Sequence, residues 1–294
     1  MHIEDFIEYL SNQKRYSPHT VKAYQNDLIQ FFQFTLQTYE TTDEDHITHQ
    51  IIRSWVIEKL NEGISTRSVN RKLSSLKTFY KFLRKKNIVK INPLEKMIAP
   101  RMKKTLPEFV SRSQMDLLLD EIDFGTDFTS VRNKLIIEML YFSGMRVSEL
   151  VNLQTQGVDL YHSQIKVTGK RNKQRIIPFD TELKNAIEKY LQERNSLMNT
   201  DTSTRFFITP KGKPIYSRLV YNIVNAYLSK VSTLKKKSPH ILRHTFATHM
   251  LNNGADLNAV KELLGHANLS ATQVYTHNTI EKLKTIYNQA HPRA

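Results

Sequence analysis

A basic stretch with three prolines separates two helical parts of the 294-residue chain. Asn92-Pro93, Pro100 and Pro107 bracket it, and no apolar periodicity runs through it. Proline removes a backbone donor and disfavours helix at the residue before it, so such a stretch is typical of an interdomain linker. We therefore expect a first domain at residues 1–98, a linker at 99–110 and a second domain at 111–294.

The first part has the apolar spacing of a helical bundle. Ser17-Pro18 is a typical helix start, and apolar residues follow it at helical intervals. Further helices are expected over 49–60 and 65–86. The last of these has an apolar stripe opposite a basic face, so it can pack in a core and still meet phosphates. The stripe consists of Val69, Leu73, Leu76, Tyr80 and Leu83.

The second part is also mostly helical, with one interruption by short β-type runs. These cover 158–161, 164–168 and 174–178, and a further strand is expected at 205–208. Gly169 to Lys173 forms a compact basic hairpin turn between two of the runs. The sequence therefore predicts a mainly α protein of two domains, the second carrying a small antiparallel sheet.

Positive charge is concentrated in one segment. The formal net charge is +15, yet residues 1–50 carry a net charge of −5 while residues 51–104 carry +12. Such a segment favours a polyanion partner, because neutralised phosphates release condensed counterions. A solubilising surface is the alternative. The candidate phosphate contacts are Arg67, Arg71, Lys81 and Lys85 of the third helix, Arg101, Lys103 and Lys104 of the linker, and Arg171 and Lys173 of the hairpin.

Composition excludes several kinds of chemistry. The chain has no cysteine, which removes disulfides and thiolate catalysis. It has no apolar run of the roughly 20 residues that a membrane span needs, and its acidic N-terminal residues are unlike a signal peptide, so we expect a cytoplasmic protein. His244 and His249 lack an accompanying carboxylate pair, so no metal site is expected. Nor is a glycine-rich phosphate-binding loop present.

Five residues spread over the second part together fit the chemistry of a phosphodiester. Arg146 follows Ser143-Gly144, His240 and Arg243 stand three residues apart at an expected helix start, and His266 precedes Tyr275 by nine residues. Charge develops on two non-bridging oxygens as a phosphodiester reacts, and arginine holds such oxygens by paired bonds. A tyrosine could then attack phosphorus. Each residue alone has an ordinary explanation, such as a surface ion pair between Arg146 and Glu149.

Lys170 lies at the tip of the basic hairpin. Neighbouring arginines would lower the pKa of a lysine that reaches into a site from this rim, making it a usable proton donor to a departing oxygen. Most turn lysines are simply solvated, and Arg171, Lys173 and Arg175 are basic neighbours that could be confused with it.

These motifs resemble those of the tyrosine recombinases, most closely the bacterial Xer type. The resemblance covers essentially the whole chain. A shorter match is His291-Pro-Arg-Ala294 at the C-terminal end. One departure is Arg171, which stands where the family's hairpin often has glycine. Five motifs carry the resemblance to the family: residues Ser143 to Leu150, Gly169 to Arg175, His240 to His249, Leu263 to Asn268, and Tyr275 to His277.

The resemblance implies a fold and a role for each residue. The first domain would be the family's SAM-like, core-DNA-binding domain, and the second its catalytic domain. Tyr275 would attack the scissile phosphate to form a 3′-phosphotyrosyl link, without metal or ATP. The implied helpers are Arg146 and Arg243 as clamps on the phosphate, His266 as a further donor, Lys170 as the acid for the 5′-oxygen, His240 in proton transfer at the tyrosine, and Glu149 as the residue that orients the arginines.

The resemblance also implies partners. The protein would act as a tetramer on two double-stranded DNA core sites, associated with the nucleoid, in chromosome or plasmid dimer resolution and thus chromosome partition at cell division. It leaves open a homotetramer or a heterotetramer with a paralogous recombinase, and it admits regulation by a DNA translocase. A C-terminal tail would dock on a neighbouring protomer through Ile280, Leu283 and Ile286-Tyr287. The alternatives are a mobile-element integrase, a type IB topoisomerase and a non-catalytic DNA-binding protein.

Overall fold

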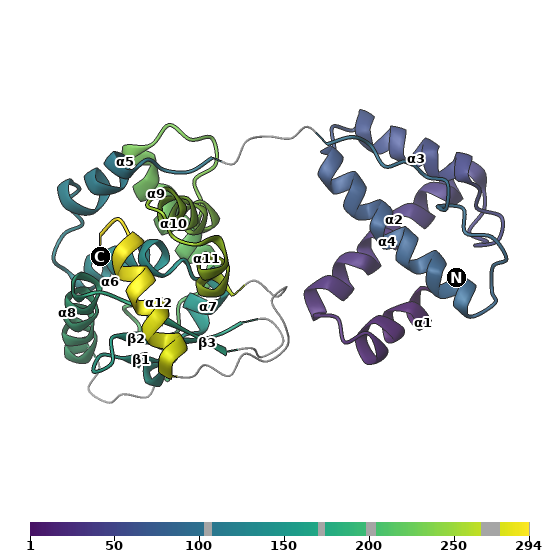
Figure 1. Cartoon of the computed structure of the whole chain (residues 1–294). Coiled ribbons are helices and arrows are strands. Elements are labelled where there is room, and N and C mark those ends of the chain that lie inside the picture. Colours follow the sequence, from purple (N-terminus) through teal and green to yellow (C-terminus); the bar gives the residue numbers. More distant parts are fainter. Residues whose placement is uncertain (103–107, 170–173, 198–203, 266–276, 294) are drawn as a thin grey trace. The chain divides into compact units, whose positions relative to one another are not determined.

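The computed structural model describes residues 1–102, 108–169, 174–197, 204–265 and 277–293. The chain divides into two compact units, Met1–Thr105 and Leu106–Ala294 (Figure 1). Both are mainly helical, and the second contains a small antiparallel sheet, which confirms the predicted fold class. Among the described residues, no helix combines the length and the apolar character needed to cross a membrane.

The first unit is a helical bundle. Its short first helix continues into a π-helical turn at Tyr9–Gln13. Its helices are α1 (Ile3–Glu8), α2 (Pro18–Tyr39), α3 (His49–Asn61) and α4 (Thr66–Lys85).

Local capping explains why these helices begin where the sequence predicts. The hydroxyl groups of Ser17, Thr48 and Ser65 each accept a hydrogen bond from the backbone N–H three residues further on. Such bonds satisfy a donor that has no partner inside the helix. The predicted bounds of 49–60 and 65–86 are therefore within one residue of the observed ones.

The predicted apolar stripe of α4 faces the core of this unit, and each of its five residues is buried. Aromatic rings pack between α2, α3 and α4. Phe79 lies edge-on to Phe32 of α2, and Phe31 lies edge-on to Trp55 of α3. The opposite face of α4 is exposed to solvent, so the amphipathic interpretation of this helix is correct.

In the second unit, the other elements pack around one long helix that is almost wholly buried. This helix, α6 (Phe128–Ser143), contacts α8 and α10 most extensively. The other α-helices among the described residues are α5 (Arg112–Asp116), α7 (Val147–Asn152), α8 (Thr181–Leu197), α9 (Ser217–Val231), α10 (Pro239–Asn252), α11 (Leu257–Leu264) and α12 (His277–Ala290). A π-helical turn at Leu117–Glu121 follows α5, and a short 3-10 helix at Thr155–Gly157 precedes the sheet.

The sheet consists of β1 (Val158–Asp159), β2 (Gln164–Thr168) and β3 (Gln174–Pro178), paired antiparallel in that order. The first strand ends two residues earlier than predicted, and a turn in which Ser163 has a φ of 51° leads into β2. The predicted strand at 205–208 is wrong. Its ends instead make isolated bridges, from Arg205 to Gln154 and from Ile208 to Pro214.

The C-terminal helix packs on its own unit. Leu283, Tyr287 and Ala290 are buried against residues of α10 and α11, and Figure 1 shows α12 lying beside these helices. Beyond the helix, the His291 ring stacks between the rings of Tyr287 and Phe142. The predicted exchange of this tail between protomers stays a prediction.

Candidate functional site

The turn between α6 and α7 places Arg146 at the start of a helix. Gly144 ends α6 with a φ of 57°, and a Cβ at this position would collide with the Phe246 ring and lie 2.9 Å from Leu264 Cδ2. Glycine is therefore required by both conformation and space. The turn brings Arg146 to the N-cap position of α7, with its side chain 39 % exposed.

Glu149 holds this arginine from one turn further along α7. Its Oε1 accepts from Arg146 Nη1 at 2.8 Å, and its Oε2 accepts from the Arg146 backbone N–H at 2.7 Å. The Glu149 side chain is only 2 % exposed. A buried carboxylate with these partners is not the surface ion pair that the sequence alone left open.

A further residue, Arg175 of β3, also donates hydrogen bonds to Glu149. Arg175 Nη1 and Nη2 donate to the two carboxylate oxygens at 2.7 and 2.9 Å. Burial by itself raises the pKa of Glu149, but the bonds and charge of Arg175, with the bonds from Arg146, outweigh it and lower that pKa to about 2. The sequence interpretation noted Arg175 only as a basic neighbour of Lys170 and missed this contact.

Arg243 reaches the same place from α10. It is 7 % exposed, and its Nη1 and Nη2 donate to the carbonyl oxygens of Gly144 and Leu264 at 2.6 and 2.7 Å. Burial, and then the nearby charges of Arg146 and Arg175, lower the pKa of Arg243 to about 10. The guanidinium therefore still carries its charge near neutral pH. His240 is exposed in the first turn of the same helix.

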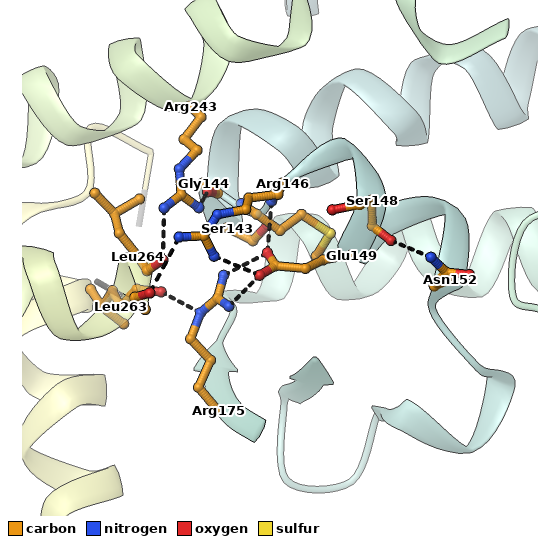
Figure 2. Close-up of polar contacts among 12 residues, drawn as sticks. Ser143, Gly144, Arg146, Ser148, Glu149, Asn152, Arg175, Arg243, Leu263 and Leu264 are labelled. Atoms are coloured by element: carbon orange, nitrogen blue, oxygen red, sulfur yellow. Dashed lines mark hydrogen bonds and ion pairs between the residues drawn. The ribbon is translucent and has the colours of Figure 1, made fainter. Parts of the chain in front are cut away.

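The three guanidinium groups converge around Glu149 and the end of α11 (Figure 2). Arg175 Nε donates to the Leu263 carbonyl at 2.7 Å, Arg243 to that of Leu264, and Arg146 Nη2 to that of Gly265 at 3.2 Å. Three positive groups around one carboxylate leave a net charge of about +2. Such a cluster suits an anionic ligand with several oxygens.

The remaining predicted catalytic residues, Lys170, His266 and Tyr275, lie outside the described residues. So do the DNA-contact candidates Lys103, Lys104, Arg171 and Lys173. Where the structure does describe the chain, it brings together Arg146, Glu149 and Arg243 from positions up to 97 residues apart in sequence.

The two further histidines of α10 have no arrangement for a metal. His249 is buried, and its Nδ1 is 2.9 Å from the hydroxyl of Tyr141. Burial lowers the pKa of both His244 and His249. Within the described part of the chain, no group of three potential ligands could hold a metal ion.

The basic face of α4 contains the other described candidates. Arg67, Lys81 and Lys85 are exposed, as is Arg101 beyond the helix. Arg71 differs, because both of its terminal nitrogens donate to the carboxylate of Asp27, which is itself 1 % exposed. Its guanidinium is thus held in one orientation on this face, a contact that the sequence interpretation did not foresee.

The chain thus consists of two mainly helical units, and the second unit contains a cluster of three arginines around one carboxylate. Comparison with family models is more specific. Residues 108–282 match the model of the phage integrase family, and residues 3–87 match that of the phage integrase N-terminal SAM-like domain. The chain belongs to the phage integrase family.

Similar curated proteins cover the full chain. The tyrosine recombinase XerC of Chlorobaculum parvum is 39 % identical to it, over 99 % of this chain and 94 % of the relative. The tyrosine recombinase XerC of Oceanobacillus iheyensis is also 39 % identical, over 100 % and 97 % of the two chains. The predicted resemblance to Xer-type tyrosine recombinases is therefore confirmed.

Two solved structures share the fold. The XerH site-specific recombinase bound to its difH substrate, in a post-cleavage complex, has a TM-score of 0.74 at 20 % identity, over 99 % of this chain and 81 % of that one. The Tn1549 transposon integrase in complex with transposon right end DNA has a TM-score of 0.71 at 19 % identity, over 96 % and 98 % of the two chains.

Proposed function

We propose that this protein is a site-specific DNA recombinase that cuts and rejoins DNA through a covalent link to Tyr275. The observation that carries the proposal is the convergence of Arg146 and Arg243. A guanidinium has five N–H donors, and each of these arginines uses two in the bonds to described residues given above, so three of its donors take no part in those bonds. The names of the full-length relatives support the same activity.

The proposed reaction needs no external energy source. The phenol oxygen of Tyr275 attacks phosphorus, the bond from phosphorus to the 5′-oxygen breaks, and the DNA 3′ end becomes a phosphotyrosine. His240 assists removal of the phenol proton, and Lys170 gives a proton to the departing 5′-oxygen. A 5′-hydroxyl of the partner strand then attacks the phosphotyrosine and reverses the step, so the phosphoryl bond is conserved.

The two arginines stabilise the negative charge that develops on the phosphate as the phosphodiester becomes a phosphotyrosine. Arg146 and Arg243 hold the two non-bridging oxygens of the phosphate, and His266 donates a further bond. Because Glu149 and the backbone carbonyls already fix both guanidinium groups, little reorganisation is needed when the phosphate becomes pentacoordinate.

The basic face of α4 supports binding of double-stranded DNA by the first unit. We expect Arg67, Lys81, Lys85 and Arg101 to contact phosphates, and the affinity to fall steeply with salt concentration. By analogy with the XerC relatives, we propose that the biological role is resolution of chromosome or plasmid dimers in the bacterial cytoplasm, by a tetramer on two duplexes.

Strand exchange tests this function. DNA sites enriched from a random pool by the full chain are placed on two fragments carrying different labels. We expect recombinant products that contain both labels, formed by assemblies of four protomers in sedimentation. Relaxation of a supercoiled plasmid without exchange between fragments would instead show a topoisomerase, and binding with neither reaction would show a non-catalytic protein.

A further inference from the structure

Three consecutive backbone carbonyls at the C-terminal end of α11 are hydrogen-bonded to arginine side chains. The carbonyls of Leu263, Leu264 and Gly265 each accept a hydrogen bond from a different arginine, and these arginines come from β3, α10 and the start of α7. The last carbonyls of a helix have no partner inside it and carry its negative partial charge, so guanidinium groups are favourable there. The end of α11 is thus a common support for the whole cluster.

Arg175 has a different environment from the other two. Its Nε donates to Leu263, and both terminal nitrogens donate to Glu149, so the fork is engaged on each of its three nitrogens. Its side chain is 5 % exposed, whereas that of Arg146 is 39 % exposed. The side chain also packs against Gly265, where an added Cβ would lie 3.0 Å from Arg175 Cδ. This arginine faces the protein rather than a ligand.

We propose that Arg175 is a positioning residue for the cleavage reaction, an inference that rests on the function proposed above. It joins two supports of the cluster: the carboxylate that holds Arg146, and the helix end that holds Arg243 and Arg146. Loss of its fork leaves Glu149 with Arg146 as its remaining guanidinium partner among the described residues, and removes the Nε–H bond to the Leu263 carbonyl. Both phosphate-clamping arginines then lose their fixed separation.

Arg175 also has an electrostatic effect on the phosphate. The Glu149 carboxylate would repel an approaching phosphodiester, and its pairing with the buried Arg175 offsets that charge. Arg146 and Arg243 are then free to balance the charge of the phosphate. The same charge on Arg175 contributes to the lowered pKa of Arg243.

The test is single-turnover cleavage of a nicked site at saturating concentrations of enzyme. Arg175→Lys keeps the charge and removes the fork. We expect its cleavage rate to fall about 100-fold, the usual effect of misplacing reacting groups by about 1 Å, with the DNA Kd within about threefold of the wild-type value. The matched control is Arg132→Lys, which alters another buried arginine that donates to the Ile208 carbonyl in this unit. We expect the control to cleave at close to the wild-type rate.

A double-variant cycle keeps the test decisive if Arg175→Lys folds poorly. Arg175→Gln with Glu149→Gln removes both charges of the buried pair and leaves neither one uncompensated. If the two residues act as one unit, the double variant cleaves no more slowly than the slower single variant.

Three results would overturn the inference: an Arg175→Lys rate within about threefold of wild type, an equal loss in Arg132→Lys, or single-variant losses that multiply in the double variant. Failure of the wild-type protein to cleave would overturn the proposed function as well. Cleavage by the wild-type protein therefore distinguishes failure of this inference from failure of the proposed function.

Discussion

Glu149 is a buried carboxylate whose ionised form depends on two arginines. Its pKa in the folded protein, about 2, lies below the ordinary value of 4.5 because the bonds from Arg175 and Arg146 outweigh burial. A lowered carboxylate pKa contributes stability that is present above pH 4.5 and is lost as pH falls through about 2.

Glu149→Gln tests this dependence in urea unfolding of the second unit. We expect the difference in unfolding free energy between wild type and variant to shrink by about 2 kcal/mol between pH 6 and pH 3. Over this range the unfolded wild-type chain takes up a proton at Glu149, whereas the folded protein, with its lowered pKa, stays mostly ionised. A difference that stays constant over this range contradicts the assignment.

Glu138 of α6 shows the opposite behaviour. It is 5 % exposed, and burial raises its pKa to about 7, although Lys134 at 3.8 Å partly opposes the shift. The folded protein thus binds this proton more tightly than the unfolded chain, so ionisation increasingly destabilises the fold from about pH 4.5 up to about pH 7.

Replacement of Glu138 by glutamine removes that destabilisation. We expect the effect of Glu138→Gln on unfolding free energy to be about 2 kcal/mol more favourable at pH 8 than at pH 5. Denaturant titrations at the two pH values measure it. A variant effect independent of pH would show that Glu138 ionises normally in the folded protein.

At the scale of elements, α2 and α4 are joined by a buried ionic network. Asp27 of α2 accepts hydrogen bonds from Arg71, Lys72 and Ser75 of α4. Lys72 is itself 6 % exposed. The network thus places a buried ammonium group beside the carboxylate that orients Arg71, and it links the core of the bundle to the basic face.

Asp27→Asn should lower the stability of the first unit by about 3 kcal/mol, because it leaves the Lys72 charge buried without its partner. Chemical denaturation measures the loss. Adding Lys72→Met should recover part of it, whereas the exposed control Asp5→Asn should change stability by less than about 0.5 kcal/mol. No recovery in the double variant contradicts the role given to Lys72.

Elements were more predictable from sequence than contacts were. The start of α2 and the apolar stripe of α4 depend on signals within a few residues, such as Ser17-Pro18. The pairs formed by Arg175 with Glu149 and by Arg71 with Asp27 span 26 and 44 residues. No local pattern distinguishes these arginines from their basic neighbours, so only the fold identifies them.

The expected strand at 205–208 fails for a related reason. Phe206, Phe207 and Ile208 have the composition of a strand, but they are buried against α8, where the Tyr190 hydroxyl donates to the Phe206 carbonyl. Aromatic packing rather than a ladder of backbone bonds therefore explains this apolar run.

At the scale of the molecule, the last residues of the chain secure the second unit. Arg293 donates to Asp120 and Glu182, and it lies 3.3 Å from Asp116. These carboxylates belong to the segment around α5 and to α8, while α12 covers the helices that carry Arg243 and the Leu264 carbonyl. The tail and the arginine cluster therefore share α10 and α11.

Deletion of the residues after Asn278 should impair cleavage as well as pairing of two sites. The deletion uncovers Phe246 and Leu263, which now pack beneath α12. Adduct yield and site pairing measure the two effects. Arg293→Ala is the milder comparison, with an expected loss of about 1 kcal/mol because its partners are half exposed. An unchanged adduct yield in the truncation contradicts the coupling.

The central claim is that DNA becomes linked to Tyr275, and mapping the linkage tests it most directly. The protein is trapped on a nicked site from the enriched pool, digested with protease, and the peptide bound to the DNA 3′ end is sequenced by mass spectrometry. We predict that the linked residue is Tyr275 and that Tyr275→Phe forms no adduct. A link at another residue, or an adduct formed by Tyr275→Phe, would contradict the account.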